Sequence, residues 1–343
     1  MNNSVGSSAG TNIAIIGTGG TISNAGVDDP LDYLTYLDRG VVLSVDDVLS
    51  RYPDAARAAN LVTVPFGTFR SRNVGPREWL DLRNQVVATL ADESVAGVVI
   101  AHGTGTLEET AYYLNLAVAT RKPIVVVGAQ RTPSSVSSDA YSNFVNAVRV
   151  AASGQAQGKG ALVVMNDAIH SARDVTKMFN HRLETMTSPT LGPLGYIEPD
   201  GSVVFYRESL RLHTQASEFA GAEAWSDDML APRVDVVYSY GGADEVMIDV
   251  AVAAGAVGIV VAGFAPGVNT VAQDAAIERA LAAGVTVVQS TRTAGAVLLR
   301  ESTIEQGLVA SGDLTVQHAR ILLQMCLVHG LGLEQTREAF ARY

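Results

Sequence analysis

The 343-residue sequence contains a single cysteine, Cys326, and only three lysines among its 24 basic residues. One cysteine excludes a disulfide framework and any thiolate-rich metal site. It lies in an apolar stretch that is typical of a helix core, so we predict a structural role for it. The sequence also has no uninterrupted apolar run of about 18 residues, the length that a membrane-spanning helix needs. We therefore predict a protein with no membrane partner.

Positive charge is scarce as well, since 35 acidic residues face 24 basic ones and give a formal net charge of −11. This balance argues against a nucleic-acid or anionic-membrane partner. Residues 1–11 are polar and rich in Ser and Gly, without the charged-then-apolar order of a secretion signal. We predict that they form a disordered leader and that the protein is a cytoplasmic enzyme. Because 48% of the residues are hydrophobic, a large core is expected, and the length of 343 residues predicts more than one domain.

Short apolar runs alternate with segments in which apolar residues recur at helical spacing. This order is typical of βαβ units and predicts an α/β fold around parallel sheets. A polar stretch of mixed charge, 208–232, predicts a linker between two domains, 12–207 and 233–343. The predicted strands span 12–17, 97–101, 124–128, 161–165, 234–238, 258–262 and 285–289. The predicted helices span 78–90, 107–119, 139–152, 243–254, 271–283, 316–328 and 333–340.

Ligands of such sheets bind beyond the carboxyl ends of the strands, so the residues after each strand matter most. The first strand leads into a glycine-rich segment, 17–23, which carries the hydroxyls of Thr18, Thr21 and Ser23. Glycines let the backbone turn sharply and approach a ligand closely. A phosphate-binding loop is the alternative, but the spacing fits neither G-x-x-x-x-G-K-S/T nor G-x-G-x-x-G.

The second predicted strand leads into the segment 102–110, where Thr104 lies at the strand end. Thr106 and Glu109 have the spacing of a capping box, which predicts that Thr106 caps the following helix. Glu108 and Glu109 also suit the first helical turn electrostatically, so we interpret both as helix-start residues.

Lys177 follows the strand predicted at 161–165 by a short loop. A lysine in a loop is commonly a solvated surface residue, and Lys159 is interpreted in that way. In a chain that otherwise uses arginine, Lys177 invites a functional interpretation. Lysine loses its proton when its surroundings disfavour the charge, whereas arginine does not. Lys177 is therefore a candidate general base.

Taken together, these segments resemble the bacterial asparaginases and glutaminase-asparaginases that use a threonine nucleophile. The resemblance covers residues 12–343 and implies a larger N-terminal parallel-sheet domain and a smaller C-terminal α/β domain. It further implies a small-molecule substrate, no cofactor, no metal, and a homotetramer of two intimate dimers whose active sites are shared between subunits. The motifs that carry it span 18–22, 102–104, 122–123, 163–167, 173–177 and 192–197.

The same resemblance implies roles for single residues. Thr21 corresponds to the nucleophile, which attacks an amide carbonyl and forms an acyl-enzyme. Thr104 corresponds to the second catalytic threonine, and Lys177 to the base that acts on it. A loop tyrosine helps to activate the nucleophile in the family; Tyr36 is the candidate here and Tyr33 the alternative.

The substrate pocket implied by the resemblance departs from the family pattern. Ser71 matches the serine that binds the substrate carboxylate, but the next residues are Arg72 and Asn73, where the family has a small polar residue and an aspartate. Gly105 replaces the aspartate of the His-Gly-Thr-Asp-Thr motif, which pairs with the catalytic lysine and holds the substrate α-ammonium. Glu301 is the candidate for the acidic residue of the neighbouring subunit. Gly20 and Gly103 complete the predicted lining.

A pocket that binds an α-ammonium needs negative charge, because a buried unpaired ammonium is costly. The loss at Gly105 and the gain at Arg72 therefore predict an amide, lactam or ester substrate that bears a carboxylate and lacks a free α-amino group. The loss also predicts a lower pKa for Lys177 than in its family counterparts. Two alternatives are an asparaginase or glutaminase with compensating changes, and an inactive small-molecule-binding homologue. Retention of Thr21 and Thr104 argues against an inactive site.

Overall fold

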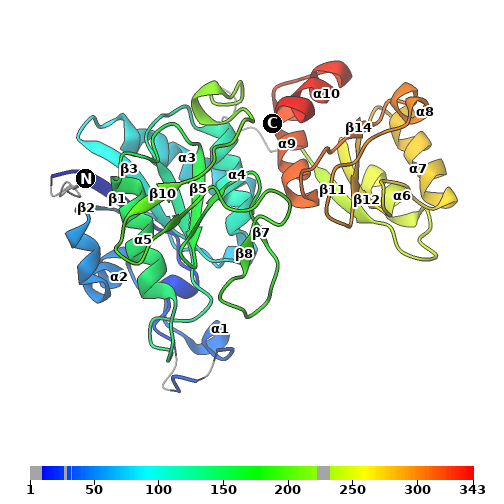
Figure 1. Ribbon diagram of the computed structural model, residues 1–343. Helices are drawn as coiled ribbons and strands as arrows, with labels where there is room; N and C mark the ends of the chain where they lie inside the picture. The colour runs from blue at the N-terminus through cyan, green and yellow to red at the C-terminus, as the bar shows by residue number, and fades with distance from the viewer. Residues whose placement is uncertain (1–9, 27–28, 32, 222–231) are drawn as a thin grey trace. The chain divides into compact units, whose positions relative to one another are not determined.

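The computed structural model describes residues 10–26, 29–31, 33–221 and 232–343, and Figure 1 shows the chain. The chain forms two compact units, Met1–Ala220 and Gly221–Tyr343. The predicted leader lies outside the described residues up to residue 9, and so do 222–231 of the predicted linker. The first half of that linker packs on the first unit instead of running free. Its Phe219 side chain is buried, and the Ser217 hydroxyl donates to the Leu116 carbonyl at 2.6 Å.

The first unit is built on an eight-stranded sheet, which confirms the predicted larger α/β unit. Its strands are β1 (Asn12–Gly17), β2 (Asn60–Val64), β3 (Val95–Ala101), β4 (Ile124–Val127), β5 (Ala161–Met165), β6 (Ala168–Ser171), β9 (Gly195–Ile197) and β10 (Val203–Phe205). They lie in the order β10-β9-β6-β5-β4-β3-β1-β2. The strands from β5 to β2 are parallel, whereas β6, β9 and β10 pair antiparallel. A separate two-stranded ladder joins β7 (Thr176–Lys177) to β8 (Met186–Thr187).

Helices cover both faces of this sheet, and Figure 1 shows α2 and α5 on one side and α3 and α4 on the other. Side chains alternate between the faces of a strand, so both sets in β1 are apolar. Ile13 and Ile15 belong to the buried cluster that also holds Phe144 of α5. The helices of this unit are α1 (Tyr36–Arg39), α2 (Val45–Arg51), α3 (Pro76–Ala91), α4 (Leu107–Ala117) and α5 (Ala140–Ala152). Short 3₁₀ turns span Thr21–Ser23, Pro53–Arg57, Ser71–Asn73 and Thr214–Ala216.

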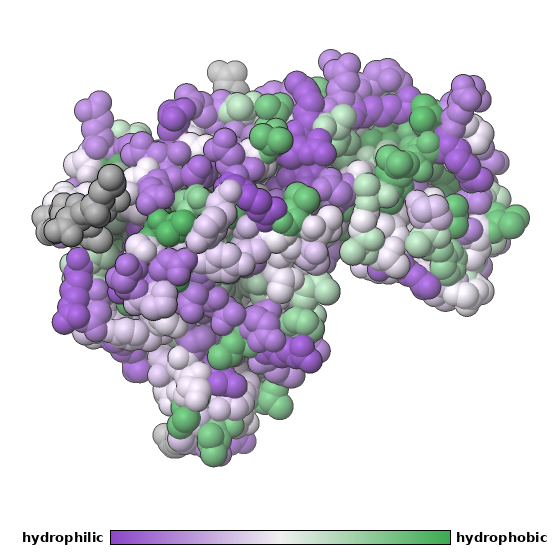
Figure 2. All heavy atoms as spheres, in the orientation of Figure 1, coloured by the Kyte–Doolittle hydropathy of each residue, from purple (hydrophilic) through white to green (hydrophobic). Residues whose placement is uncertain are grey.

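The second unit has a parallel four-stranded sheet in the order β11-β12-β13-β14. Its strands are Val234–Tyr238 (β11), Gly258–Gly263 (β12), Thr286–Thr291 (β13) and Val309–Ala310 (β14), and its helices are Val246–Ala253 (α6), Val271–Ala282 (α7), Glu301–Glu305 (α8), Val316–Val328 (α9) and Leu333–Arg342 (α10). Helix α9 buries Cys326, as predicted. Figure 2 shows hydrophobic residues gathered on the visible face of this unit. Val246, Met247 and Val250 of α6 are all exposed.

Several helices begin at residues whose side chains satisfy free backbone donors. The hydroxyls of Thr270 and Thr315 accept from the backbone N–H groups of Gln273 and His318, each at 3.2 Å, and so start α7 and α9. Helix α3 begins with Pro76, whose fixed φ suits the first helical turn. Within the described part of the chain, no helix is both long and apolar enough to cross a membrane.

Candidate active site

The residues predicted for catalysis come together at the carboxyl ends of the parallel strands. Thr21 follows β1 and Thr104 follows β3, and these two strands are neighbours in the sheet. The backbone N–H of Thr18 donates to the Ala101 carbonyl at 2.9 Å, which joins the two strand ends. Gly20 has a φ of +86°, and a Cβ built on it would collide with the backbone of Gly103. The absence of side chains at both glycines therefore lets the two loops touch.

Thr21 and Tyr36 form the first hydroxyl pair of the site. The Oγ1 atom of Thr21 lies 2.7 Å from the phenol oxygen of Tyr36, and either atom can donate. Burial raises the pKa of Tyr36, with a smaller rise from Asp139 and an opposing effect of the Thr21 hydrogen bond. The phenol is therefore neutral at neutral pH.

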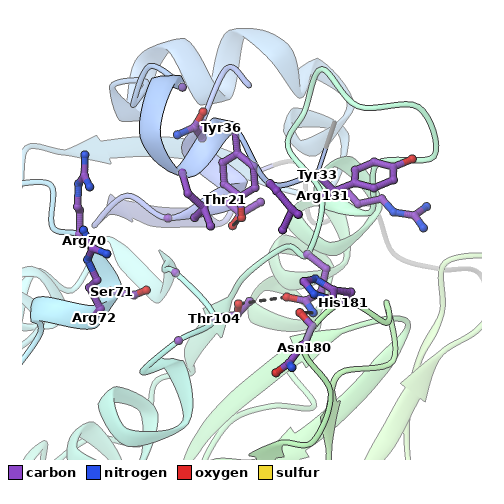
Figure 3. Close-up of a pocket in the computed structure, with 18 of the residues that line it drawn as sticks. Thr21, Tyr33, Tyr36, Arg70, Ser71, Arg72, Thr104, Arg131, Asn180 and His181 are labelled. Carbon is purple, nitrogen blue, oxygen red and sulfur yellow. Dashed lines mark hydrogen bonds between the residues drawn. The ribbon is translucent and has the colours of Figure 1, made fainter. Parts of the chain in front are cut away.

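The alternative tyrosine, Tyr33, does not contact Thr21. Its hydroxyl donates to the Val136 carbonyl at 3.4 Å, and its ring lies under the Arg131 guanidinium at 4.8 Å from the centroid. Figure 3 shows Tyr36 beside Thr21 and Tyr33 farther along the pocket wall. The geometry thus pairs the predicted nucleophile with Tyr36 rather than with Tyr33.

Thr104 and Lys177 form the second group. The Nζ atom of Lys177 donates to the Thr104 hydroxyl at 2.7 Å, and both residues also donate to Gln130 Oε1 at 3.2 Å. Burial lowers the pKa of Lys177, while the nearby Glu108 carboxylate raises it. The result is a downward shift, which brings the amine closer to the neutral form that a base needs.

Lys177 does not lie in a loop, contrary to our interpretation of the segment after β5. Asn166 and Asp167 have φ values of +53° and +61° and turn the chain into β6, after which Lys177 ends the short strand β7. Its backbone N–H donates to Glu108 Oε2 at 2.8 Å. Glu108 therefore anchors the lysine strand, a contact that the helix-start interpretation missed.

The predicted capping box at α4 is wrong. Thr106 is the N-cap residue, but its side chain makes no cap hydrogen bond. Its hydroxyl instead donates to the Ser71 carbonyl at 2.7 Å. This bond holds the 3₁₀ turn Ser71–Asn73 against the segment that follows Thr104.

A cavity of about 620 Å³ opens between these groups. Gly20, Gly103, Gly105, Ser71 and Arg72 line it as predicted, whereas Asn73 is not among its lining residues. A Cβ at Gly105 would lie 2.9 Å from Ser71 Oγ, so a side chain there requires the Ser71 hydroxyl to rotate away. Figure 3 shows Arg70, Ser71 and Arg72 together on one wall of the pocket, with His181 and Asn180 on another.

The charges along the cavity are of one sign among the residues that the structure describes. Arg70, Arg72, Arg131 and Lys177 line it, and no Asp or Glu does. Predicted Glu301 begins α8 in the second unit, where it is exposed. Its part in substrate binding stays a prediction. No cluster of three His, Cys, Asp or Glu side chains that could hold a metal was found in the described ranges.

The other two lysines have structural partners. Lys122 Nζ donates to the carbonyls of Leu90 and Asp92, both at 2.8 Å, and so satisfies the end of α3. Lys159 Nζ lies 3.3 Å from the exposed Glu208 carboxylate. Lys177 is therefore the lysine that lines the pocket.

Gln130 was missed by the sequence reasoning, although a signal for it existed. It follows β4 at the same edge of the sheet where Thr21 and Thr104 follow β1 and β3. The rule that residues after parallel strands line the site applies to it equally. Polar residues are common in loops, so residue type alone did not distinguish Gln130 from its neighbours.

Comparison with known proteins identifies the class. The family description "Asparaginase, N-terminal" matches residues 12–211, and "Glutaminase/Asparaginase C-terminal domain" matches 233–340. "L-asparaginase 2" of Bacillus subtilis is 39% identical over 97% of this chain and 86% of its own length. "Glutaminase-asparaginase" of Pseudomonas fluorescens biotype A is 34% identical over 97% of this chain and 90% of its own length.

The fold agrees with these matches. The crystal structure described as "Probable Cytoplasmic L-asparaginase from Campylobacter jejuni" superposes with a TM-score of 0.90 at 34% identity, covering 97% of this chain and all of that one. The two units and the joined strand ends thus define an α/β amidohydrolase that acts on C–N bonds. The chain belongs to the asparaginase family.

Proposed function

We propose that this amidohydrolase cleaves an amide, lactam or ester of a carboxylate-bearing substrate that has no free α-amino group. The observation that carries the proposal is the charge of the cavity. Its described lining holds Arg70, Arg72, Arg131 and Lys177 and no carboxylate. Such a lining favours an anionic ligand and disfavours an ammonium, which would be desolvated beside cations.

In the proposed reaction, the Thr21 hydroxyl attacks the carbonyl carbon of the substrate, and its proton passes to the hydrogen-bonded Tyr36 phenol, which gives its own proton to the leaving nitrogen. The C–N bond breaks, and the nitrogen takes a proton as it leaves. Water then attacks the resulting ester and restores the Thr21 hydroxyl.

Lys177 and Thr104 form the proposed second proton relay. A neutral Lys177 amine accepts the proton of the Thr104 hydroxyl, with which it is hydrogen-bonded. The downward pKa shift of Lys177 supports this role. Ser71 lines the same cavity, and its hydroxyl is the proposed partner of the substrate carboxylate.

A second candidate is an asparaginase or glutaminase in which the loss at Gly105 is compensated. The names of the Bacillus and Pseudomonas relatives favour it. In that case Glu301 of a neighbouring subunit supplies the missing negative charge. A third possibility, an inactive small-molecule-binding homologue, is one outcome of the same experiment.

The deciding experiment measures ammonia release from asparagine, glutamine, succinamate and N-acyl-asparagine, together with the ring opening of lactams and lactones. We expect turnover of the substrates without a free amine and little turnover of asparagine. Rapid asparagine hydrolysis would support the second candidate, and silence on every substrate would support the third. Thr21→Ala is the control, since it removes the proposed nucleophile and any genuine activity with it.

We further propose that the chain assembles as a homotetramer of two intimate dimers in the cytoplasm. The exposed apolar residues Val246, Met247 and Val250 on α6 support self-association. The description of the Campylobacter jejuni neighbour as cytoplasmic supports the location. Analytical ultracentrifugation tests the assembly, and fractionation of the native cells tests the location.

A further inference from the structure

Gln130 connects the two residues of the proposed proton relay. It lies just after β4, and its Oε1 atom accepts from Thr104 Oγ1 and from Lys177 Nζ, both at 3.2 Å. The Lys177–Thr104 bond of 2.7 Å closes the triangle. Three polar atoms from three different segments of the chain therefore meet at one point of the pocket wall.

The orientation of the Gln130 amide is fixed by its other end. Nε2 donates to the backbone carbonyls of Asn180 and Arg182, at 3.0 and 3.2 Å. A carbonyl can only accept, so the amino end must face these two atoms and the oxygen must face Lys177 and Thr104. The backbone N–H of Gln130 also donates to the Asp139 carboxylate, at 3.0 and 3.1 Å, which fixes the base of the side chain.

The charges around Lys177 give this arrangement its significance. Within the described chain, the Nζ atom has hydrogen bonds to Thr104 and Gln130 and no ion pair. The nearest carboxylate that acts on it is Glu108, which accepts from the backbone N–H of the lysine. Arg131 and His181 line the same cavity. Gly105, where the family motif has aspartate, offers no side chain at all.

We propose that Gln130 is a positioning residue that replaces the motif carboxylate, aligning Lys177 Nζ with the Thr104 hydroxyl without adding negative charge. The inference rests on the proposed roles of Thr104 and Lys177. When the amine is neutral, one N–H stays on Gln130 Oε1 and the lone pair faces Thr104. The Thr104 O–H bond then breaks as the third N–H bond of the ammonium forms. A carboxylate would orient the lysine equally well, but it would favour the charged form.

The scarcity of lysine makes a direct test practical. Protein labelled with ¹³C at lysine Cε gives three lysine signals, which Lys122→Arg and Lys159→Arg assign. The titration midpoint of Lys177 is followed in the wild type, Gln130→Glu and Gln130→Met. Gln155→Glu introduces the same charge change at an exposed position outside the pocket and is the matched control.

We expect Gln130→Glu to raise the Lys177 midpoint by about one pH unit or more, since it places a carboxylate beside the amine. Gln130→Met removes an acceptor of the ammonium, so the midpoint falls and kcat drops with little change in KM. Gln155→Glu changes neither quantity. In Gln130→Glu the new carboxylate faces the carbonyls of Asn180 and Arg182, so thermal unfolding of each variant checks that the fold is intact. If one Gln130 variant is unfolded, the Lys177 midpoint of the other variant tests the inference.

An unchanged Lys177 midpoint in both Gln130 variants would overturn the inference, because a residue with a purely structural role leaves this titration alone. The outcome is independent of the proposed function. If no amide, lactam or ester is turned over by the wild type, the proposed function fails, yet the midpoints still report whether Gln130 controls the lysine.

Discussion

The Thr21 hydroxyl and the Tyr36 phenol lie 2.7 Å apart, in direct hydrogen-bond contact. Tyr36 is the first residue of α1, and this short helix carries the buried tyrosine to the end of β1. Tyr33, only three residues earlier, bonds to the Val136 carbonyl instead. The two tyrosines therefore form a matched pair with which the activation of the nucleophile can be tested.

Tyr36→Phe is expected to lower kcat by about 10²-fold or more, since it removes the proton partner of Thr21 and leaves the ring in place. Tyr33→Phe loses only a 3.4 Å bond to a backbone carbonyl, and its kcat should stay close to that of the wild type. Steady-state kinetics on the best substrate of the panel compare the two. Equal losses in both variants would show that the contact with Thr21 has no special role.

Gly105→Asp is expected to shift the substrate preference toward amides with a free α-amino group, because it restores negative charge to the cavity. A Cβ at this position would lie 2.9 Å from Ser71 Oγ. The Ser71 hydroxyl can rotate away from it, so we expect little loss of unfolding free energy. The ratio of kcat/KM for asparagine to that for succinamate measures the shift. Gly105→Ala introduces the same crowding without charge and is the control.

The same variant is expected to change the pH dependence of the reaction. Burial now lowers the pKa of Lys177, and a new carboxylate in the cavity would raise it. If the neutral amine is the base, as we propose, activity rises as pH increases through this pKa. The rising limb of the pH–rate profile should thus move to higher pH in Gly105→Asp. Identical profiles in the two proteins would contradict the proposed role of the lysine as a base.

Arg72→Gln should raise KM for a carboxylate substrate by about tenfold to hundredfold, the effect of losing one charge-assisted hydrogen bond. Arg72 lines the cavity, whereas Arg77 is exposed on α3 outside it. Arg77→Gln therefore carries the same change of charge and should leave KM unaltered. If Arg72→Gln had a normal KM, the cationic wall would not be the carboxylate site.

Acid should destabilise the fold through two buried histidines. Burial lowers the pKa of His102 and of His170 to about 4. The unfolded chain then binds more protons between this value and the ordinary histidine pKa of about 6.5. The stabilisation is complete above pH ~6.5 and is lost as pH falls toward 4, on the order of 3 kcal/mol per histidine. Urea unfolding from pH 7 to 4.5 measures this slope.

His170→Gln should flatten that slope, while His181→Gln should not, since His181 is exposed. His170 Nδ1 lies 2.9 Å from the Ser188 hydroxyl, away from the nucleophile, so the variant tests stability separately from catalysis. A slope that is the same in all three proteins would mean that other groups control the acid transition.

Much of the fold could be predicted from periodicity. The strands β1, β5 and β11 match the predicted ranges residue for residue, as does α9. Strands β1 and β5 are apolar along most of their length and are buried on both faces, whereas α9 shows apolar residues at helical spacing. The edge strand β2 was missed because most of its residues are only partly covered. Strand β6 was missed because its antiparallel turn is made by Asn166 and Asp167 in place of the glycine that usually signals one.

Candidate site residues could be named from the sequence where they belong to a short local motif. Contacts between segments that are far apart in the sequence could not be predicted in this way. Thr21, Thr104 and Lys177 were named in advance, and the structure brings Lys177 to Thr104. The Gln130 bridge and the Glu108 anchor join segments of the chain that are far apart in the sequence. The role of the Thr106 hydroxyl was mistaken because its capping pattern is local, whereas its real partner, the Ser71 carbonyl, is not.

The contact between Gly20 and Gly103 has a wider consequence. It brings the loop that carries Thr21, the proposed nucleophile, against the loop that carries Thr104 through main-chain atoms. The spacing between the two loops is thereby set by the backbone and does not depend on the Arg72 side chain. In such a site, the side chains that bind the substrate can change without moving the two threonine loops. The same fold can therefore accept different acyl groups with one arrangement of reactive atoms.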